Sequence, residues 1–361
     1  MGSASAEMGF ARFLLILLLL SLLTTTSTAQ SFKCSSPASC SALVGYAPYN
    51  ATTLSEIQSQ FNVKKFHSLL GANNLPLSTP RTYSIKSKQT VKVPIPCICY
   101  NNTGVSNKVP IYTVKKDDGL YFIASTVFSG LLKYPQIVVA NKIPDKDKID
   151  IGQKLWIPLP CSCDEVSGEK VVHYAHVVEA GSTVEEIAKR FGTDSQTLLS
   201  INGMANDSQL MADQSLDVPL KACNSSIKEN SLDYSLLVPN GSYAITAGAC
   251  VKCSCDSPDW TLQCEPSQLN TTISNWGACP SMQCEEVSGS PYIGNTTSLS
   301  NCNRSTCAYA GYDNKTIFTS PTTESTCPAS PPSGNNSSKI DSNWNFLFIC
   351  VFTLLLCFYL S

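Results

Sequence analysis

The sequence predicts an α+β protein with three tandem strand–helix–helix–strand units, which disulfides tie together, followed by a cysteine-rich C-terminal module. Three observations predict this architecture. One hydrophobic pattern recurs with closing prolines at positions 94, 158 and 219, a Cys-x-Cys pair follows each of the first two copies, and ten further cysteines lie between residues 223 and 327. A period of ~60 residues is too long for a solenoid unit and fits a very small domain.

The composition indicates a protein outside the cell. The chain has 361 residues, 18 cysteines, 14% charged residues and a net charge of −2. Structural disulfides persist in oxidising compartments, and N-linked sugar would keep a surface so poor in charge soluble. The predicted N-glycosylation sites are Asn50, Asn101, Asn206, Asn224, Asn240, Asn270, Asn295, Asn303 and Asn314. Because the chain has no basic excess, we expect no nucleic-acid partner.

Residues 1–29 predict a secretory signal peptide. Arg12 precedes an apolar run of 11 residues at 13–23, and Ser27 and Ala29 fit the small residues that precede a cleavage site. The alternative, a membrane-spanning anchor, needs ~20 apolar residues. We therefore expect cleavage after Ala29.

The C-terminal end predicts a glycosylphosphatidylinositol (GPI) anchor. Residues 346–361 are strongly apolar, with no Lys or Arg after them to form a cytoplasmic flank. Small residues, a polar spacer and an apolar tail have the layout of a GPI signal. We expect attachment at Asn335 or Asn336, with Gly334 as the fallback, in a polar stalk at 328–345. The alternative is a short tail anchor. With a GPI anchor, a lipid would be the protein's only link to the membrane, and the protein would lie on the extracellular face of the plasma membrane.

The second repeat, residues 108–163, shows the periodicity most clearly. Residues 110–114 alternate β-branched and aromatic side chains as a strand does, and a polar turn follows at 116–119. The apolar residues of 120–128 are spaced as one helical face. A second helix at 134–140 ends near Asn141, and 154–158 predict the closing strand.

The first repeat, residues 30–100, and the third, residues 172–223, follow the same order. Each buries so little apolar surface that it needs a covalent staple. The Cys-x-Cys pairs at 97–99 and 161–163, with Cys34 and Cys40 upstream, can supply the staples. Neighbours in such a pair rarely bond to each other, so each cysteine must reach another segment. A zinc site is disfavoured by the secretory compartment.

These residues resemble the lysin motif, or LysM, in the run from Tyr112 to Ala124 and in the closing segment 151–158 (IGQKLWIP). Three such units with Cys-x-Cys joints, a signal peptide and a lipid-anchor tail resemble the plant LysM receptor-like proteins, in their chitin elicitor-binding branch. The resemblance covers residues 34–327. It is specific in the second repeat and looser in the others, because 46–50 (YAPYN) and 181–183 (GST) replace the usual Gly-Asp before the first helix.

The resemblance implies three disulfides that knot the repeats into one block. They pair Cys34 with Cys99, Cys40 with Cys163, and Cys97 with Cys161. It implies no pairing for the ten cysteines that follow. We assign residues 224–327 to a module that disulfides hold together.

The sequence offers no pattern for catalysis. Glu185 and Glu186 are adjacent on a predicted helix and diverge, whereas a glycosidase needs two facing carboxylates. No histidine triad is evident among His67, His173 and His176. The last two lie on opposite faces of a predicted strand, which disfavours a metal site. We expect a protein that is not an enzyme and that needs no cofactor and no metal.

The resemblance implies a binding groove instead, between the loop after the first strand and the loop before the second. In the second repeat these loops comprise Lys116, Asp117, Asp118, Gly119, Leu120, Tyr121, Phe122, Pro144, Asp145, Lys146, Asp147, Lys148, Ile149, Asp150 and Ile151. Chitin is neutral and N-acetylated, so its groove needs backbone amide groups and small apolar contacts.

Each of these residue types has an expected role. Gly119 would let the chain approach the sugar closely. Apolar contacts would come from Leu120, Tyr121, Pro144 and Ile149, and hydrogen bonds to hydroxyls from Asp118, Asp145 and Lys148. The alternative for Leu120 and Ile149 is a place in the core, and Asn141 is expected to cap its helix.

The second repeat is the expected chitin site because it alone keeps an Asp-Gly-Leu turn, and a glycan on Asn50 would sit at the groove mouth of the first. A lipid-anchored binder cannot signal inward, so we expect a LysM receptor kinase as its partner, and a homodimer on long chitin oligosaccharides. Peptidoglycan or a lipo-chitooligosaccharide stays open as the ligand, and a non-signalling cell-wall adhesive as the role.

Overall fold

The structure is a computed structural model of the chain, and it describes residues 31–35, 38–225, 227–256, 260–269, 276–298 and 303–325. The predicted signal peptide, the candidate anchor residues Asn335 and Asn336, and the hydrophobic tail lie outside these residues. Within the described ranges, no helix has the length and apolar character needed to cross a membrane. The chain divides into two compact parts, residues 1–295 with 306–321 and residues 296–305 with 322–361.

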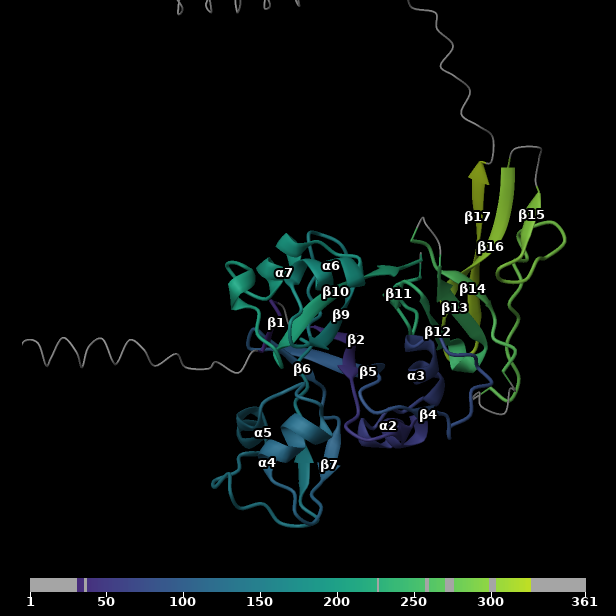
Figure 1. Ribbon diagram of the computed structural model, residues 1–361. Coiled ribbons are helices and arrows are strands. Elements are labelled where there is room, and N and C mark those ends of the chain that lie inside the picture. The colour runs from purple at the N-terminus through teal and green to yellow at the C-terminus, as the bar shows by residue number, and fades with distance from the viewer. Residues whose placement is uncertain are drawn as a thin grey trace, which may run out of the picture. The chain divides into compact units, whose positions relative to one another are not determined.

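The first repeat has the order strand, helix, helix, strand (Figure 1). Its elements are β2 (Ser39–Tyr46), α2 (Leu54–Gln60), α3 (Phe66–Ala72) and β5 (Val91–Tyr100), and β2 pairs with β5 antiparallel. Helix α2 begins with a capping box, because Thr53 accepts from the Glu56 N–H while the Glu56 carboxylate accepts from the Thr53 N–H. Two short strands, β3 (Thr52–Thr53) and β4 (Ser84–Ile85), pair across its loops.

The second repeat has the same order with shorter elements. Strands β7 (Ile111–Thr113) and β8 (Lys154–Trp156) pair antiparallel, and α5 (Tyr134–Asn141) is its second helix. The first helix is a single turn, α4 (Leu120–Phe122), that continues as a π-helix, η1 (Ile123–Val127), in which the Phe128 N–H donates to the Ile123 carbonyl at 2.9 Å. The regular α-helix expected at 120–128 is thus wrong in detail. The extra residue in the turn still leaves Ile123 and Phe128 buried.

The third repeat comprises β9 (Val171–Val177), α6 (Val184–Phe191), α7 (Ser195–Ile201) and β10 (Ser215–Cys223). Thr183 and Glu186 form a capping box at the start of α6, and Gly192 ends the helix with φ of 70°, a left-handed conformation that favours glycine. Glu186 is therefore a helix cap, and Glu185 is exposed beside it.

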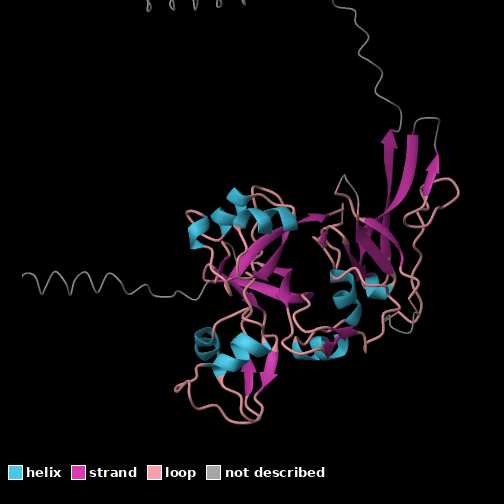
Figure 2. Ribbon diagram, in the orientation of Figure 1, coloured by secondary structure: helices cyan, strands magenta, loops and turns pink. Residues whose placement is uncertain are grey.

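The first and third repeats share one sheet, which the sequence pattern did not predict. Its strand order is β1-β6-β5-β2-β9-β10-β11, with β1 (Phe32–Lys33), β6 (Thr103–Ser106) and β11 (Val238–Pro239) as further members. Strands β2 and β9 pair in parallel at two positions only, Leu43 with Tyr174 and Val44 with Ala175. Strands β7 and β8 of the second repeat form a separate sheet (Figure 2).

An asparagine at the end of the second helix repeats the same hydrogen bonds in all three repeats. Its Nδ2 donates to a helix carbonyl four residues earlier and to a carbonyl of the closing strand, and its Oδ1 accepts from the N–H of that strand residue. The three are Asn73, Asn141 and Asn202. Asn141 therefore ties helix to strand, and its amide is fully engaged.

A glutamine just before the closing strand is a second shared feature. Its Oε1 accepts a backbone N–H three residues earlier at 3.0 Å in each repeat. The pairs are Lys86 with Gln89, Asp150 with Gln153, and Met211 with Gln214. The first repeat therefore shares local geometry with the other two, although its sequence departs most from the motif.

Aromatic residues join the first repeat to the second. Phe61 lies edge-on to Phe128 with ring centroids 5.6 Å apart, and both belong to one buried cluster that draws side chains from both repeats. Tyr46 and Tyr112 pack against these two rings from either side. The core of the third repeat is a separate cluster.

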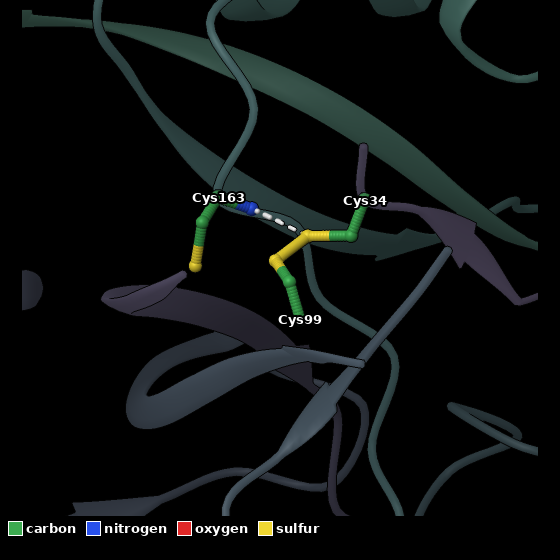
Figure 3. A group of neighbouring side chains, drawn as sticks. All are labelled: Cys34, Cys99 and Cys163. Atoms are coloured by element: carbon green, nitrogen blue, oxygen red, sulfur yellow. Dashed lines mark hydrogen bonds between the residues drawn. A yellow bond between two sulfur atoms is a disulfide. The ribbon is translucent and has the colours of Figure 1, made fainter. Parts of the chain in front are cut away.

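The disulfides of the repeats are Cys34–Cys99, Cys40–Cys163 and Cys97–Cys161, the same pairs that the family resemblance implies. Their sulfurs are crowded: the Sγ atoms of Cys34, Cys99 and Cys163 lie within 4.8 Å of one another (Figure 3). Each of these sulfurs is already in a disulfide, so none is a free thiolate that could hold a metal.

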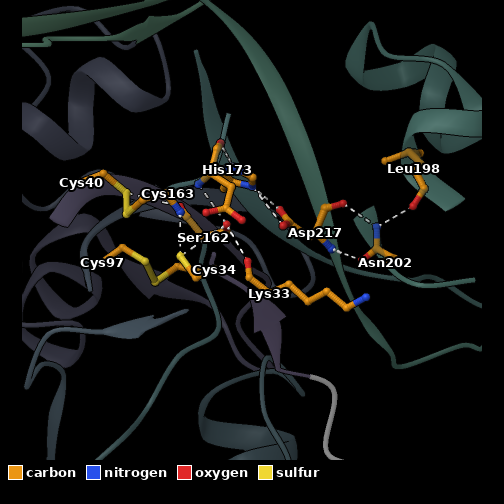
Figure 4. Close-up of polar contacts among 12 residues, drawn as sticks. Lys33, Cys34, Cys40, Cys97, Ser162, Cys163, His173, Leu198, Asn202 and Asp217 are labelled. Atoms are coloured by element: carbon orange, nitrogen blue, oxygen red, sulfur yellow. Dashed lines mark hydrogen bonds and ion pairs between the residues drawn. A yellow bond between two sulfur atoms is a disulfide. The ribbon is translucent and has the colours of Figure 1, made fainter. Parts of the chain in front are cut away.

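A buried histidine lies beside this knot (Figure 4). His173 Nδ1 lies 2.8 and 3.0 Å from the two carboxylate oxygens of Asp217, and its Nε2 lies 2.8 Å from the Asp164 carbonyl oxygen. Both partners are acceptors, so both ring nitrogens must carry a proton. Burial lowers the pKa of His173, but the Asp217 charge and the hydrogen bonds raise it more, so the net shift is upward.

The two histidines of β9 predict opposite effects of pH on stability. A raised pKa means that the folded chain holds its proton more tightly, so the stabilisation by His173 is complete below about pH 6.5 and disappears as pH rises through the folded pKa. Burial lowers the pKa of His176 to about 4. The unfolded chain then takes up that proton first, so stability falls as pH drops from about 6.5 toward 4.

We therefore expect the free energy of unfolding to peak near pH ~6.5, with a loss of about 3 kcal/mol on the acid side from His176. Denaturant unfolding between pH ~4.5 and ~9 measures it. The double variant His173→Gln with Asp217→Asn should flatten the alkaline side, and His176→Leu the acid side. An unchanged alkaline slope in the double variant would show that the buried pair does not titrate in this range.

The C-terminal module begins with a three-stranded sheet of β12 (Ser242–Thr246), β13 (Val251–Cys255) and β14 (Gln263–Pro266). A second sheet comprises β15 (Thr296–Ser298), β16 (Asn303–Tyr312) and β17 (Ile317–Ser325). Its disulfides among the described residues are Cys223–Cys255, Cys250–Cys279, Cys253–Cys264 and Cys284–Cys307. Cys302 and Cys327 lie outside the described residues.

Eight of the predicted glycosylation sites lie on exposed residues, so the structure gives a sugar access to them. These are Asn50, Asn101, Asn206, Asn224, Asn240, Asn295, Asn303 and Asn314. Asn270 lies outside the described residues. Glycosylation at each position remains a prediction.

Candidate functional site

The first loop of the second repeat is held by one carboxylate. Asp118 Oδ2 accepts from the Lys115 N–H at 2.7 Å and from the Tyr112 hydroxyl at 2.8 Å. Burial, the hydrogen bond to Asp118 and its charge together raise the pKa of Tyr112 well above its usual range. One oxygen of Asp118 therefore fixes the turn, and only Oδ1 is available for a sugar hydroxyl.

The second loop folds on itself in a similar way. Asp145 Oδ1 accepts from the Asp147 N–H at 3.1 Å, and Asp145 Oδ2 pairs with the Lys148 ammonium at 3.1 Å. These contacts lower the pKa of Asp145, the bond from the Asp147 N–H most of all. Asp150 donates its N–H to Gln153, and Lys146 pairs with Asp147 on the surface. Both loops are therefore preformed before any ligand arrives.

The structure divides the apolar residues expected in this groove between the core and the surface, and their contact with a sugar stays a prediction. Leu120 is only 3% exposed and belongs to the core, and Ile149 is half-buried against the same core. The exposed apolar side chains of the two loops include two of the expected residues, Tyr121 at 73% and Pro144, together with Phe122 at 46% and Ile151 at 71%. The spacing of the apolar residues in 120–128 places Leu120 on the buried face of the helix. This spacing predicts the burial of Leu120 better than its position in the groove segment does.

Gly119 does not need to be glycine for its backbone conformation. Its φ is −123°, and a Cβ added there would meet no atom within 4 Å. This open space agrees with a backbone that a ligand can approach. The exposed residues of the two loops include Lys116, Asp117, Pro144, Lys146 and Lys148. Among the described residues, no hydrogen bond joins loop 116–122 to loop 144–151, so the space between them is not bridged.

The corresponding groove of the first repeat is closed by its own backbone. Strands β3 and β4 pair Thr52 with Ile85 across the two loops. The ladder continues with N–H donation from Leu54 to the Tyr83 carbonyl at 3.1 Å and from Lys88 to the Pro48 carbonyl at 2.8 Å. These hydrogen bonds join the two loops to each other and occupy several of their backbone groups, so fewer of these groups remain for a sugar amide.

The groove of the third repeat is open, but one of its loops contains a predicted glycosylation site. In the described chain, no backbone hydrogen bond joins residues 179–183 to residues 203–211. Exposed Asn206 lies in the second of these segments, with its Oδ1 accepting from Ser208. A glycan there would stand beside the groove. The second repeat has neither a closing ladder nor an acceptor sequence in its loops.

Comparison with known proteins places the chain in a family. The LysM domain model matches residues 112–158 and 176–219, the second and third repeats. "LysM domain-containing GPI-anchored protein 2" of Arabidopsis thaliana is 49% identical over 347 residues, covering 95% of this chain and 96% of the relative. The chain belongs to the LysM domain-containing GPI-anchored proteins. These matched residues do not include the first repeat. We assign the first repeat to the same fold because it shares the order of elements and the hydrogen bonds of the other two.

Two further relatives carry informative names. "Chitin elicitor-binding protein" of Oryza sativa subsp. japonica is 38% identical over 340 residues, covering 92% of this chain and 93% of the relative. "Chitin elicitor receptor kinase 1" of Physcomitrium patens is 25% identical over 195 residues, covering 54% of this chain and 29% of the kinase. The first two relatives are named for anchoring and binding, not for catalysis.

Membership in this family gives the location. LysM domain-containing GPI-anchored proteins lie on the extracellular face of the plasma membrane, held by a lipid. The predicted location is therefore confirmed. The residue that carries the lipid stays a prediction at Asn335 or Asn336.

Proposed function

We propose that this protein is a cell-surface receptor component that binds chitin oligosaccharides in the groove of its second repeat, and that it relays binding to a partner receptor kinase in plant innate immunity. One observation carries the proposal. Among the described residues of the three repeats, only the second has a groove that is neither closed by a β-ladder nor flanked by a predicted glycosylation site.

The chemistry of the groove suits chitin. A neutral N-acetylated sugar needs backbone amide partners and apolar surface for its ring faces and methyl groups. Tyr121, Phe122 and Ile151 offer exposed apolar surface on the two loops, and the Gly119 backbone is open to approach. A binding relative with chitin in its name supports this choice of ligand.

A kinase partner follows from the lipid anchor. A lipid reaches only into the membrane, so a signal must pass to a protein with a cytoplasmic domain. The similarity to a chitin elicitor receptor kinase supports a partner with LysM repeats of its own. A long chitin chain could also hold two copies of this protein, as a homodimer that gains affinity through effective concentration.

Titration of the purified mature protein tests the ligand. We expect heat of binding with chitin oligosaccharides, and weaker or no heat with peptidoglycan fragments and with lipo-chitooligosaccharides of matched backbone length. Tighter binding of either alternative would change the ligand class. No binding to any of the three would favour the adhesive role and would contradict the proposal.

A further inference from the structure

A cavity lies outside the repeat grooves. It has a volume of 510 Å³ and is lined by residues of β2, β9, α3 and the segment 233–245, all within the larger compact part of the chain. Pockets that take small ligands typically measure ~300–1,000 Å³ and often lie where domains meet. This one has the size of a site, and the groove of the second repeat contributes no residue to it.

Strand β2 presents unused backbone groups to this cavity. Just before β2, the Ala38 carbonyl accepts from the Cys99 N–H at 2.9 Å, so the alternation along the strand gives the hydrogen bonds to β5 to Cys40 and Ala42. The N–H and C=O groups of Ser39 and Ser41 therefore point the other way. Strand β9 pairs with β2 only from Leu43 onward, so among the described residues no strand meets this stretch. Backbone N–H and C=O groups without a strand partner can bind the acetamido group of an N-acetylated sugar.

The side chains around the cavity also match a sugar. Ser39 and Ser41 offer exposed hydroxyls, and Glu165 and Lys170 are exposed near them. Within the described residues, no hydrogen bond or ion pair engages these four side chains. Free acceptors and donors of this kind suit the hydroxyl rim of a pyranose.

Tyrosines form another part of the lining. Tyr234 is 49% exposed, and Tyr243 lines the cavity with its hydroxyl engaged by the Leu75 carbonyl at 2.6 Å. An aromatic ring offers an apolar face against which the C–H face of a sugar packs. The cavity thus combines an aromatic surface, free hydroxyls and open backbone amides.

We propose that this cavity is a second carbohydrate site, which binds a short glycan containing N-acetylglucosamine. It shares only the ligand class with the proposed function and does not involve the groove of the second repeat. The glycan could be a free chitin fragment or the core of an N-linked glycan, since both contain the same N-acetylated ring.

Photoaffinity labelling of the full mature protein with a diazirine derivative of chitotriose tests the proposal. We expect label on peptides covering 38–43 and 233–245. Tyr234→Ala should reduce that label about five- to tenfold. Ser41→Phe, which fills the cavity from another side, should remove it. The matched control is Tyr292→Ala, because Tyr292 is equally exposed at 49% and does not line the cavity.

The outcomes separate this proposal from the proposed function. Label on 116–151 alone would overturn the second site and leave the first intact, whereas label on the cavity alone would support the second site against the first. Competition by unlabelled chitotriose or by a released N-glycan core identifies the source of the sugar. Protection of the cavity peptides by a receptor kinase ectodomain, with no sugar label there, would assign the cavity to a protein partner and overturn the proposal.

Discussion

Replacing Cys97 and Cys161 together by alanine is expected to destabilise the protein by about 4 kcal/mol. The two residues are 64 apart in sequence and their disulfide closes the second repeat onto the first. Both are buried, so alanine adds no polar group to the core. Strands β7 and β8 form their own sheet, so the second repeat is joined to the first by this disulfide, by Cys40–Cys163 and by packing such as the Phe61–Phe128 contact.

Chemical denaturation of the purified variant measures the loss, and secretion yield gives a second readout. The matched control is the pair Cys253→Ala with Cys264→Ala in the C-terminal module. These residues are 11 apart, so their shorter loop predicts a smaller loss of about 3 kcal/mol. We expect only the first variant to lose sugar binding as well. An unfolding free energy unchanged in the first variant would rule out a structural role for the knot.

Replacing Gly104 by alanine is expected to cost about 3 kcal/mol or more. A Cβ at this position in β6 would lie 1.9 Å from the backbone carbonyl oxygen of Cys161. A backbone atom cannot turn aside as a side chain can, and Cys161 is fixed by its disulfide. The strand or the knot must therefore shift.

Gly119→Ala is the control for Gly104→Ala, because a Cβ at Gly119 meets nothing within 4 Å and its φ is −123°. Its stability should stay within about 0.5 kcal/mol of the parent. Thermal unfolding of the two variants side by side measures the difference. Equal stability of the two would mean that β6 and residue 161 are not in close contact.

The sequence predicts most local elements of the repeats because their signals are local. Periodicity places the helices and closing strands within a few residues, and the closing prolines mark the repeat length. The predicted strands at 110–114 and 154–158 are shorter in the structure, since Pro110 and Pro158 lack the N–H that a ladder needs.

Pairings between distant segments could not be predicted in this way. The parallel contact of β2 with β9 joins residues about 130 positions apart, and no periodic pattern records such a partner. The β3–β4 ladder that closes the first groove consists of two short strands in long polar loops. Neither pairing has a length or composition that distinguishes it from a loop.

In the candidate site too, some features follow from the local sequence and others only from tertiary packing. The motif predicts the two segments of the groove, and their sugar binding stays a prediction; which of their apolar residues face solvent depends on packing. Leu120 turns into the core, while Ile151 beside the closing strand stays exposed. The resemblance to LysM proteins identifies the loops, and only the folded structure separates core residues from surface residues within them.

Calorimetry with a chitin octamer on two matched variants tests the central claim most directly. Ile151→Ser removes an exposed apolar residue from the second repeat, and Met211→Ser removes one of similar exposure, 65% against 71%, from the corresponding loop of the third. We expect Ile151→Ser to lose about 1–2 kcal/mol of binding, roughly a tenfold weaker complex. Met211→Ser should bind as the parent does. Parent-like binding by Ile151→Ser together with a large loss in Met211→Ser would contradict the account and move the site to the third repeat.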